Sequence, residues 1–209
     1  MGENLSVHTG TAMKQTILVV SLAAIALLAA PIDQGQRDFA VNSLQESRKA
    51  FLDSIAGLSE AQWKFKPAAD RWSIAEVAEH VILTEAFLFG IEQNALKSPA
   101  VADRKADRAV DEALLSEMAD RTTKRESPPE IGPTGRYQNP NAAARAFKEA
   151  RGRTLEYVRT TQDALRAHVA AVGPVTRDAY QILLMIAGHG NRHVAQINEV
   201  KADAGYPKK

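Results

Sequence analysis

The sequence predicts an all-α protein that folds as a four-helix bundle. After residue 30, apolar residues recur every three or four positions, which is the spacing of a helix with one buried face. No stretch alternates apolar and polar residues for long enough to predict a strand. Four long helical patterns follow one another, and the connection between the second and the third is much longer than the others. One long connection among short ones is found in many four-helix bundles.

The composition is that of one globular domain. The chain has 209 residues, of which 45% are apolar and 24% are charged. We assign residues 1–30 to an N-terminal extension with a signal-like segment and residues 31–209 to the helical domain. The net charge is +1 without a basic block, so no nucleic-acid partner is expected. The absence of cysteine excludes disulfides, thiolate metal ligands and cysteine nucleophiles.

The N-terminal segment resembles a secretory signal peptide. Lys14 precedes an apolar run from Ile17 to Ala30 that only Ser21 interrupts. This run is shorter than the roughly 20 residues that span a bilayer. We therefore expect export to the periplasm or the extracellular space, with Met13 as the natural start. If the segment is not cleaved, it tethers the protein to the membrane.

The first helix is expected at about Gln36–Ala56, because apolar residues line one face and Gly57 provides a stop. A short helical turn at Leu58–Trp63 and a loop at Lys66–Arg71 follow. They lead into the second long helix.

The second helix has a clear start at Ser73. This residue is a favourable N-cap, and Glu76 three positions later completes a capping box. The helix should continue to about Leu96. His80 lies on an apolar row with Val77 and Phe87, so its side chain is expected to face the interior.

Residues 97–140 form the long connection. It contains a modest helix near Val110–Arg121 and a run rich in proline and glycine at Pro128–Gly135. We expect it to cross one end of the bundle. If the protein is an enzyme, the connection would also shape its pocket. The third helix should begin after Asn139–Asn141 and reach about Val172, and the last should begin near Arg177 or Asp178 and end at about Ala204.

The last helix carries two histidines one turn apart, His189 and His193. They lie on the apolar row of Met185 and Ile197, so both imidazoles point side by side into the protein. His80 supplies a third inward imidazole from another helix. Three histidines without an acidic fourth ligand are the ligand set of an open metal site.

The alternative is that these histidines are ordinary core residues. Each could then bond a neighbouring carboxylate or serine, or lie at a helix end. Burying two imidazoles on one turn is costly, and a shared metal ion resolves that cost by accepting a lone pair from each ring. The sequence therefore favours the metal site. His168 is interpreted as a surface or helix-end residue of the third helix.

Four further residues have roles that the sequence leaves open. Gln196 lies one turn from His193 and could orient that ring. Glu85 could also orient a histidine or pair with a local arginine. Arg151 and Arg192 could bind an anionic substrate, or be solvated as helix arginines commonly are. No catalytic residue is assigned.

Three segments together resemble the DinB-like (YfiT-like) superfamily. They are Leu58–Trp63, Arg71–His80 and His189–Ile197, and the similarity extends over about residues 36–204. The resemblance implies a four-helix bundle in which His80, His189 and His193 bind a divalent metal. It also implies metal-dependent hydrolases and thiol-dependent transferases or isomerases as relatives.

These observations predict a metal-dependent enzyme. One divalent transition metal per chain, which is zinc, nickel or iron, would activate a water or thiol nucleophile for hydrolysis or thiol S-transfer on a small molecule. Thiol cofactors are cytoplasmic, so they fit poorly with an exported protein. The alternatives are a non-catalytic metal-binding or stress-response bundle, and a bundle without metal. The sequence is also compatible with a homodimer.

Overall fold

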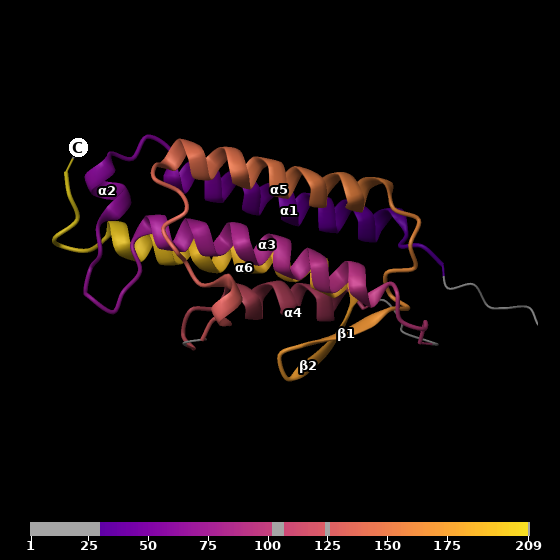
Figure 1. Cartoon of the computed structure of the whole chain (residues 1–209). Helices are drawn as coiled ribbons and strands as arrows, with labels where there is room; N and C mark the ends of the chain where they lie inside the picture. Colours follow the sequence, from indigo (N-terminus) through magenta and orange to yellow (C-terminus); the bar gives the residue numbers. More distant parts are fainter. Residues whose placement is uncertain (1–29, 102–106, 124–125, 209) are drawn as a thin grey trace, which may run out of the picture.

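The computed structural model describes residues 30–101, 107–123 and 126–208 and has the predicted four-helix bundle (Figure 1). Two helices from the beginning and middle of the chain, α1 and α5, lie side by side and pack on a second pair, α3 and α6. A fifth helix of three turns, α4, lies along α6. The helices are α1 (Gln34–Ile55), α2 (Glu60–Lys64), α3 (Ile74–Ala95), α4 (Arg108–Ala119), the 3₁₀ turn η1 (Pro129–Ile131), α5 (Pro140–Thr160) and α6 (Ala179–Lys201).

The helix starts follow the capping chemistry of the sequence. The predicted box at Ser73 forms: its hydroxyl accepts from the backbone N–H of Glu76, and the Glu76 carboxylate accepts from the backbone N–H of Ser73. Asp33 and Asp178 begin α1 and α6 with the same reciprocal arrangement. These caps satisfy N–H groups that the first turn leaves without partners, and they fix where each helix begins.

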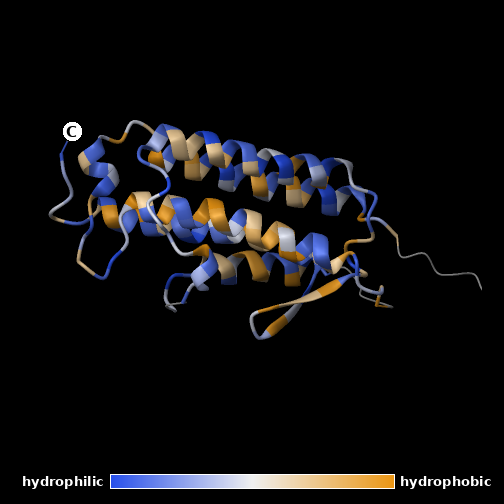
Figure 2. Cartoon of the chain, viewed as in Figure 1, coloured by the Kyte–Doolittle hydropathy of each residue, from blue (hydrophilic) through white to orange (hydrophobic). Residues whose placement is uncertain are grey.

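The core runs between the two helix pairs and is richest around α3 and α6. Figure 2 shows more hydrophobic residues on α3 and α6, whereas hydrophilic residues dominate the outer faces of α1 and α5. The difference arises because α3 packs on α2, α5 and α6, and α6 packs on α1, α3 and α4, so that both helices bury more than one face. Fully buried members of the core include Leu44, Phe51, Trp63, Phe147 and Leu183.

The predicted third helix is too long. α5 ends at Thr160, whereas the sequence predicts helix to about Val172. The hydroxyl of Thr161 accepts from the backbone N–H of Asp163, and this local turn competes with the helix. The strands β1 (Val169–Val172) and β2 (Val175–Asp178) then form an antiparallel hairpin. Each strand is too short for its alternation to be seen in the sequence.

The long connection also runs differently from the prediction. Its described residues do not cross one end of the bundle, because α4 packs along α6. Gly188 on α6 permits this approach: a Cβ there would lie 2.6 Å from the Cβ of Met118. The connection then places η1 on α3.

The predicted signal segment at residues 1–30 lies, apart from Ala30, outside the described residues. In the part of the chain that the structure describes, no helix combines the length and the apolar character needed to cross a membrane.

Candidate metal centre

The three histidines singled out in the sequence meet at one point between α3 and α6. The Nε2 atom of His189 lies 3.1 Å from that of His80 and 3.0 Å from that of His193. His80 and His193 are buried, and His189 is partly exposed. Among the described residues these three form the single group of potential ligands whose donor atoms all lie within 4.8 Å of one another.

Hydrogen bonds on the opposite ring nitrogens fix two of the three imidazoles. Nδ1–H of His80 donates to the backbone carbonyl of Ile131 at 2.8 Å. Nδ1–H of His193 donates to Oε1 of Gln196 at 2.8 Å, and the same oxygen accepts from Arg121 at 3.4 Å. A carbonyl oxygen can only accept, so each Nδ1 carries the proton and each Nε2 presents its lone pair to the centre.

This donor set fits a divalent transition metal. Lone pairs on facing ring nitrogens at about 3 Å repel one another unless a proton or a cation lies between them. Imidazole nitrogen is a preferred ligand of zinc, nickel, iron and copper, whereas magnesium and calcium prefer oxygen. Metal-bound histidines usually donate their other ring N–H to an oxygen acceptor such as a backbone carbonyl, and the Ile131 carbonyl and the Gln196 amide oxygen are acceptors of this kind.

The electrostatic surroundings keep the rings neutral, which is the form that binds metals. Burial lowers the pKa of His193 to about 3, with a further contribution from His80. Burial and the other two rings lower the pKa of His189 well below its ordinary value. Burial also lowers the pKa of His80, although its bond to Ile131 acts in the opposite direction.

The segment after η1 is attached to α3 beside this centre. The carboxylate of Glu79 is 1% exposed and accepts hydrogen bonds from the backbone N–H groups of Thr134, Gly135 and Arg136. Burial raises the pKa of Glu79, but these bonds together bring it below its ordinary value. The Trp72 ring covers another side of the centre, 5.0 Å from the ring of His80.

Of the residues with open roles, Gln196 lies where it was predicted and bonds His193. Glu85 does not touch a histidine: it forms a buried ion pair with Arg151 at 2.7 Å in the bundle interior. Arg151 and Arg192 are both buried, so the view of them as solvated is wrong. His168 lies outside any helix and donates or accepts nothing at the centre; its Nδ1 bonds the carbonyl of Ser98 at 2.9 Å.

Sequence reasoning missed Ile131 and Glu79 as residues of this centre. The Ile131 contact is made by a backbone carbonyl, which side-chain patterns cannot reveal. Glu79 left a faint signal, since it is an acidic residue directly before His80 in a largely apolar helix.

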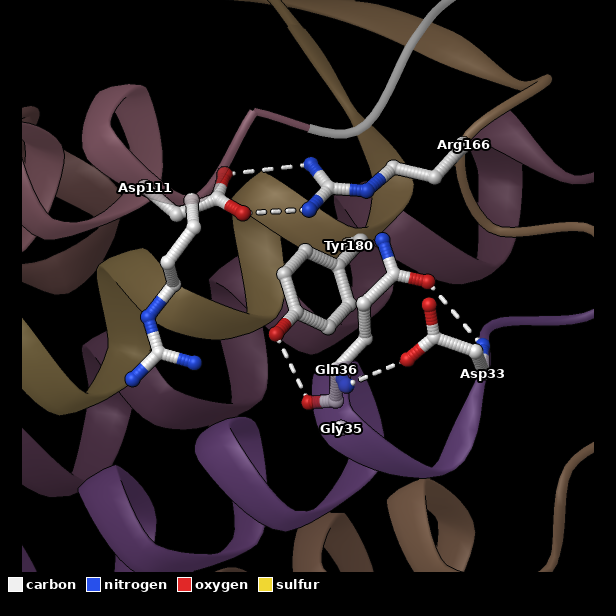
Figure 3. A pocket seen from close by; sticks show the side chains of 7 residues that line it. Asp33, Gly35, Gln36, Asp111, Arg166 and Tyr180 are labelled. Atoms are coloured by element: carbon white, nitrogen blue, oxygen red, sulfur yellow. Dashed lines mark hydrogen bonds and ion pairs between the residues drawn. The ribbon is translucent and has the colours of Figure 1, made fainter.

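A separate hollow of about 280 Å³ lies where α1, α4 and α6 begin (Figure 3). Some of its polar groups are paired: Arg166 binds Asp111, and the Tyr180 hydroxyl donates to the carbonyl of Gln36. Nε2 of Gln36 and Nε of Arg166 are buried without a hydrogen-bond partner among the described residues. None of the three clustered histidines lines it. The residues around it are Asp33, Gly35, Gln36, Arg108, Asp111, Arg166 and Tyr180.

Comparison of the sequence with known proteins gives two matches. A sequence model of the DinB superfamily matches residues 43–197, a range that contains all three histidines. The uncharacterized protein YuaE of Bacillus subtilis (strain 168) is 26% identical over 161 residues, which cover 75% of this chain and 93% of YuaE.

A solved structure shows the same fold. YfiT from Bacillus subtilis, described as a probable metal-dependent hydrolase with an unusual four-helix bundle topology, superposes with a TM-score of 0.57 and 15% identity. The match covers 84% of this chain and 91% of YfiT.

Proposed function

The chain belongs to the DinB superfamily, and from this premise we propose that it is a metal-dependent hydrolase of a small molecule. His80, His189 and His193 would hold one divalent transition metal per chain. The observation that carries this proposal is the convergence of three Nε2 atoms, two of which are left unprotonated by hydrogen bonds behind the rings. The description of YfiT as a probable metal-dependent hydrolase supports it.

The residues around the three histidines would hold the rings in place for a metal and limit the access of solvent. A metal held by three imidazoles is a Lewis acid that lowers the pKa of a water molecule into the neutral range. Gln196 and the Ile131 carbonyl hold two rings in place, and Trp72 shields one flank from solvent. The ligand set has no carboxylate, so the protein does not reduce the positive charge available at the centre.

Two finer features stay proposals. Zinc, nickel and iron all suit an all-imidazole site, and zinc is our first choice because hydrolysis needs no change of redox state. We expect the N-terminal segment to direct export of the protein. An exported protein has little access to cytoplasmic thiol cofactors, so this location favours hydrolysis over thiol transfer.

The proposal is tested with a panel of small ester and amide substrates. The chain is stripped with a chelator, reloaded with zinc and compared with His193→Ala under the same conditions. Hydrolysis that requires zinc and is absent from His193→Ala is the expected result. Equal hydrolysis by both proteins, or none by a fully loaded wild type across the panel, would contradict the assignment as a hydrolase.

A further inference from the structure

Glu79 is not one of the three proposed metal ligands, but four hydrogen bonds connect its carboxylate to the segment between η1 and α5. Its carboxylate accepts from the backbone N–H groups of Thr134, Gly135 and Arg136 and from the Thr134 hydroxyl, all at 2.8–2.9 Å. The side chain is buried, so solvent does not compete for these bonds. One carboxylate of α3 therefore holds three consecutive residues of this segment, which we term the 134–136 loop.

The backbone of this loop is shaped to receive an anion. Successive N–H groups that point to one side form a nest, and such nests bind negative charge. Gly135 has φ +82°, a conformation that side-chain-bearing residues rarely adopt. Nothing lies within 4 Å of the position that a Cβ of Gly135 would take, so the glycine is needed there for its backbone conformation and not for space. The anion in this nest is Glu79.

The same stretch of chain reaches the metal centre at a second point. Ile131 begins it, is buried against α3, and accepts the Nδ1–H of His80 at 2.8 Å. Glu79 and His80 are neighbours on α3, so adjacent residues of one helix hold the two ends of residues 131–136. A shift of the 134–136 loop away from Glu79 would therefore move the carbonyl that fixes the His80 ring.

We propose that Glu79 is a positioning residue for the centre. By holding the 134–136 loop on α3 it keeps the Ile131 carbonyl on Nδ1 of His80, and so keeps Nε2 of that ring unprotonated and directed at His189. The consequence for metal affinity rests on the proposed function, but the effect on the ring does not.

The test substitutes Glu79→Gln in the full chain and reads two properties. The first is the tautomer of His80, observed by ¹⁵N NMR in the metal-free protein. The second is zinc affinity, measured by competition with a chromophoric chelator. We expect the His80 signals to change from one tautomer to a mixture and zinc affinity to fall by roughly 10–100-fold, the loss typical of hydrogen-bond partners behind a ligand.

Two further variants separate positioning from a general loss of structure. Glu92→Gln is the matched control, because Glu92 is equally buried on the same helix but bonds Tyr157 and Gln93 instead of the loop. It should leave both readouts unchanged. Gly135→Ala keeps Glu79 intact and strains the nest alone, so it should shift both readouts in the direction of Glu79→Gln.

Each outcome decides the proposal. An unchanged His80 tautomer in a folded Glu79→Gln, or an equal loss of zinc affinity in Glu92→Gln, would overturn it. If Glu79→Gln fails to fold, an unaffected tautomer in Gly135→Ala would overturn it as well. If the wild type binds zinc, and Glu79→Gln changes the His80 tautomer without changing zinc affinity, the proposal is overturned too. If the wild type binds no zinc while the tautomer of His80 changes, the positioning role stands and the proposed function falls.

Discussion

At the scale of single residues, two hydrogen bonds decide the form in which the histidines face one another. The Ile131 carbonyl and the Gln196 amide each take up one Nδ1–H, so the protons of His80 and His193 lie behind the rings. No described residue bonds Nδ1 of His189, whose Nε2 lies between the other two. His189 is therefore the ring whose proton can occupy either nitrogen, according to whether a cation is present.

Removing a ligand and removing a partner behind a ligand should give graded effects. Gln196→Ala takes away the acceptor behind His193 and should weaken zinc binding by roughly 10–100-fold. His193→Ala removes the ligand itself and should weaken binding further, while the far-ultraviolet circular dichroism stays helical because alanine favours helices. Chelator competition measures both. Equal zinc affinities for the two variants would contradict the ligand role of His193.

A second residue-scale prediction concerns Glu92, which is far from the metal centre. Its carboxylate is 3.0 Å from the hydroxyl of Tyr157, which also contacts Asp163 at 2.8 Å. The phenol has one proton to donate, so the second contact requires a proton on one of the acids. Burial raises the pKa of Glu92 to about 7, and this identifies Glu92 as the protonated acid.

The raised pKa gives stability a defined pH dependence. The contribution of Glu92 is fully present below the unfolded pKa, near 4.3, and is lost as pH rises through about 7, because the folded state then has to ionise a buried group. Glu92→Gln should therefore stabilise the protein at pH 8, by on the order of 1–3 kcal/mol, and have little effect at pH 4.5. Urea unfolding at the two pH values measures this. A stabilisation that is equal at both values would contradict it.

At the scale of elements, the position of α4 depends on one glycine of α6. Gly188 lets Met118 and the carbonyl of Leu115 approach to distances at which a side chain would collide. Since α6 also supplies His189 and His193, this contact fixes the outer side of the helix that carries two of the three rings.

Gly188→Val should destabilise the protein by about 1–3 kcal/mol, because overpacking forces α4 or α6 to move. Gly152→Ala is the control: this helical glycine of α5 has nothing within 4 Å of its Cβ position, so alanine should be neutral or mildly stabilising there. Denaturant unfolding distinguishes them. A Gly188→Val protein as stable as Gly152→Ala would show that α4 does not pack as described.

The elements also show which parts of the structure the sequence could reveal. Ser73 and Glu76 predicted the start of α3 because capping is a local interaction. The predicted end of α5 was wrong. Thr161 forms a local turn and a short hairpin follows it, and neither is visible in the apolar periodicity of the sequence. The burial of Arg151 was missed because its partner, Glu85, is distant in sequence.

At the scale of the whole molecule, the histidine spacing and the apolar rows were enough to predict which residues converge, because two of the three lie on one helical turn. Gln196, behind His193, was also predicted, but the contacts of Ile131 and of the 134–136 loop were not, since they come from the backbone of a long connection. The fold thus supplies two packed helices for the rings and a folded connection for the contacts behind one of them.

The same arrangement couples metal binding to stability. A ligand that binds the folded state alone stabilises it by about 2.7 kcal/mol at 100 times its Kd. For a domain of this size that corresponds to a rise in Tm of roughly 5–10 °C. Thermal unfolding with zinc and with chelator should show this difference in the wild type and not in the His80/His189/His193 triple alanine variant. Equal Tm values in the wild type would favour a bundle without metal.

The most direct measurement is the metal content of the chain, purified without chelator and without nickel affinity resin, beside the triple alanine variant. We predict about one zinc, nickel or iron ion per chain in the wild type and none in the variant. No metal in either protein, or the same content in both, would contradict the assignment of His80, His189 and His193 as a metal centre, and the proposed hydrolase would fall with it.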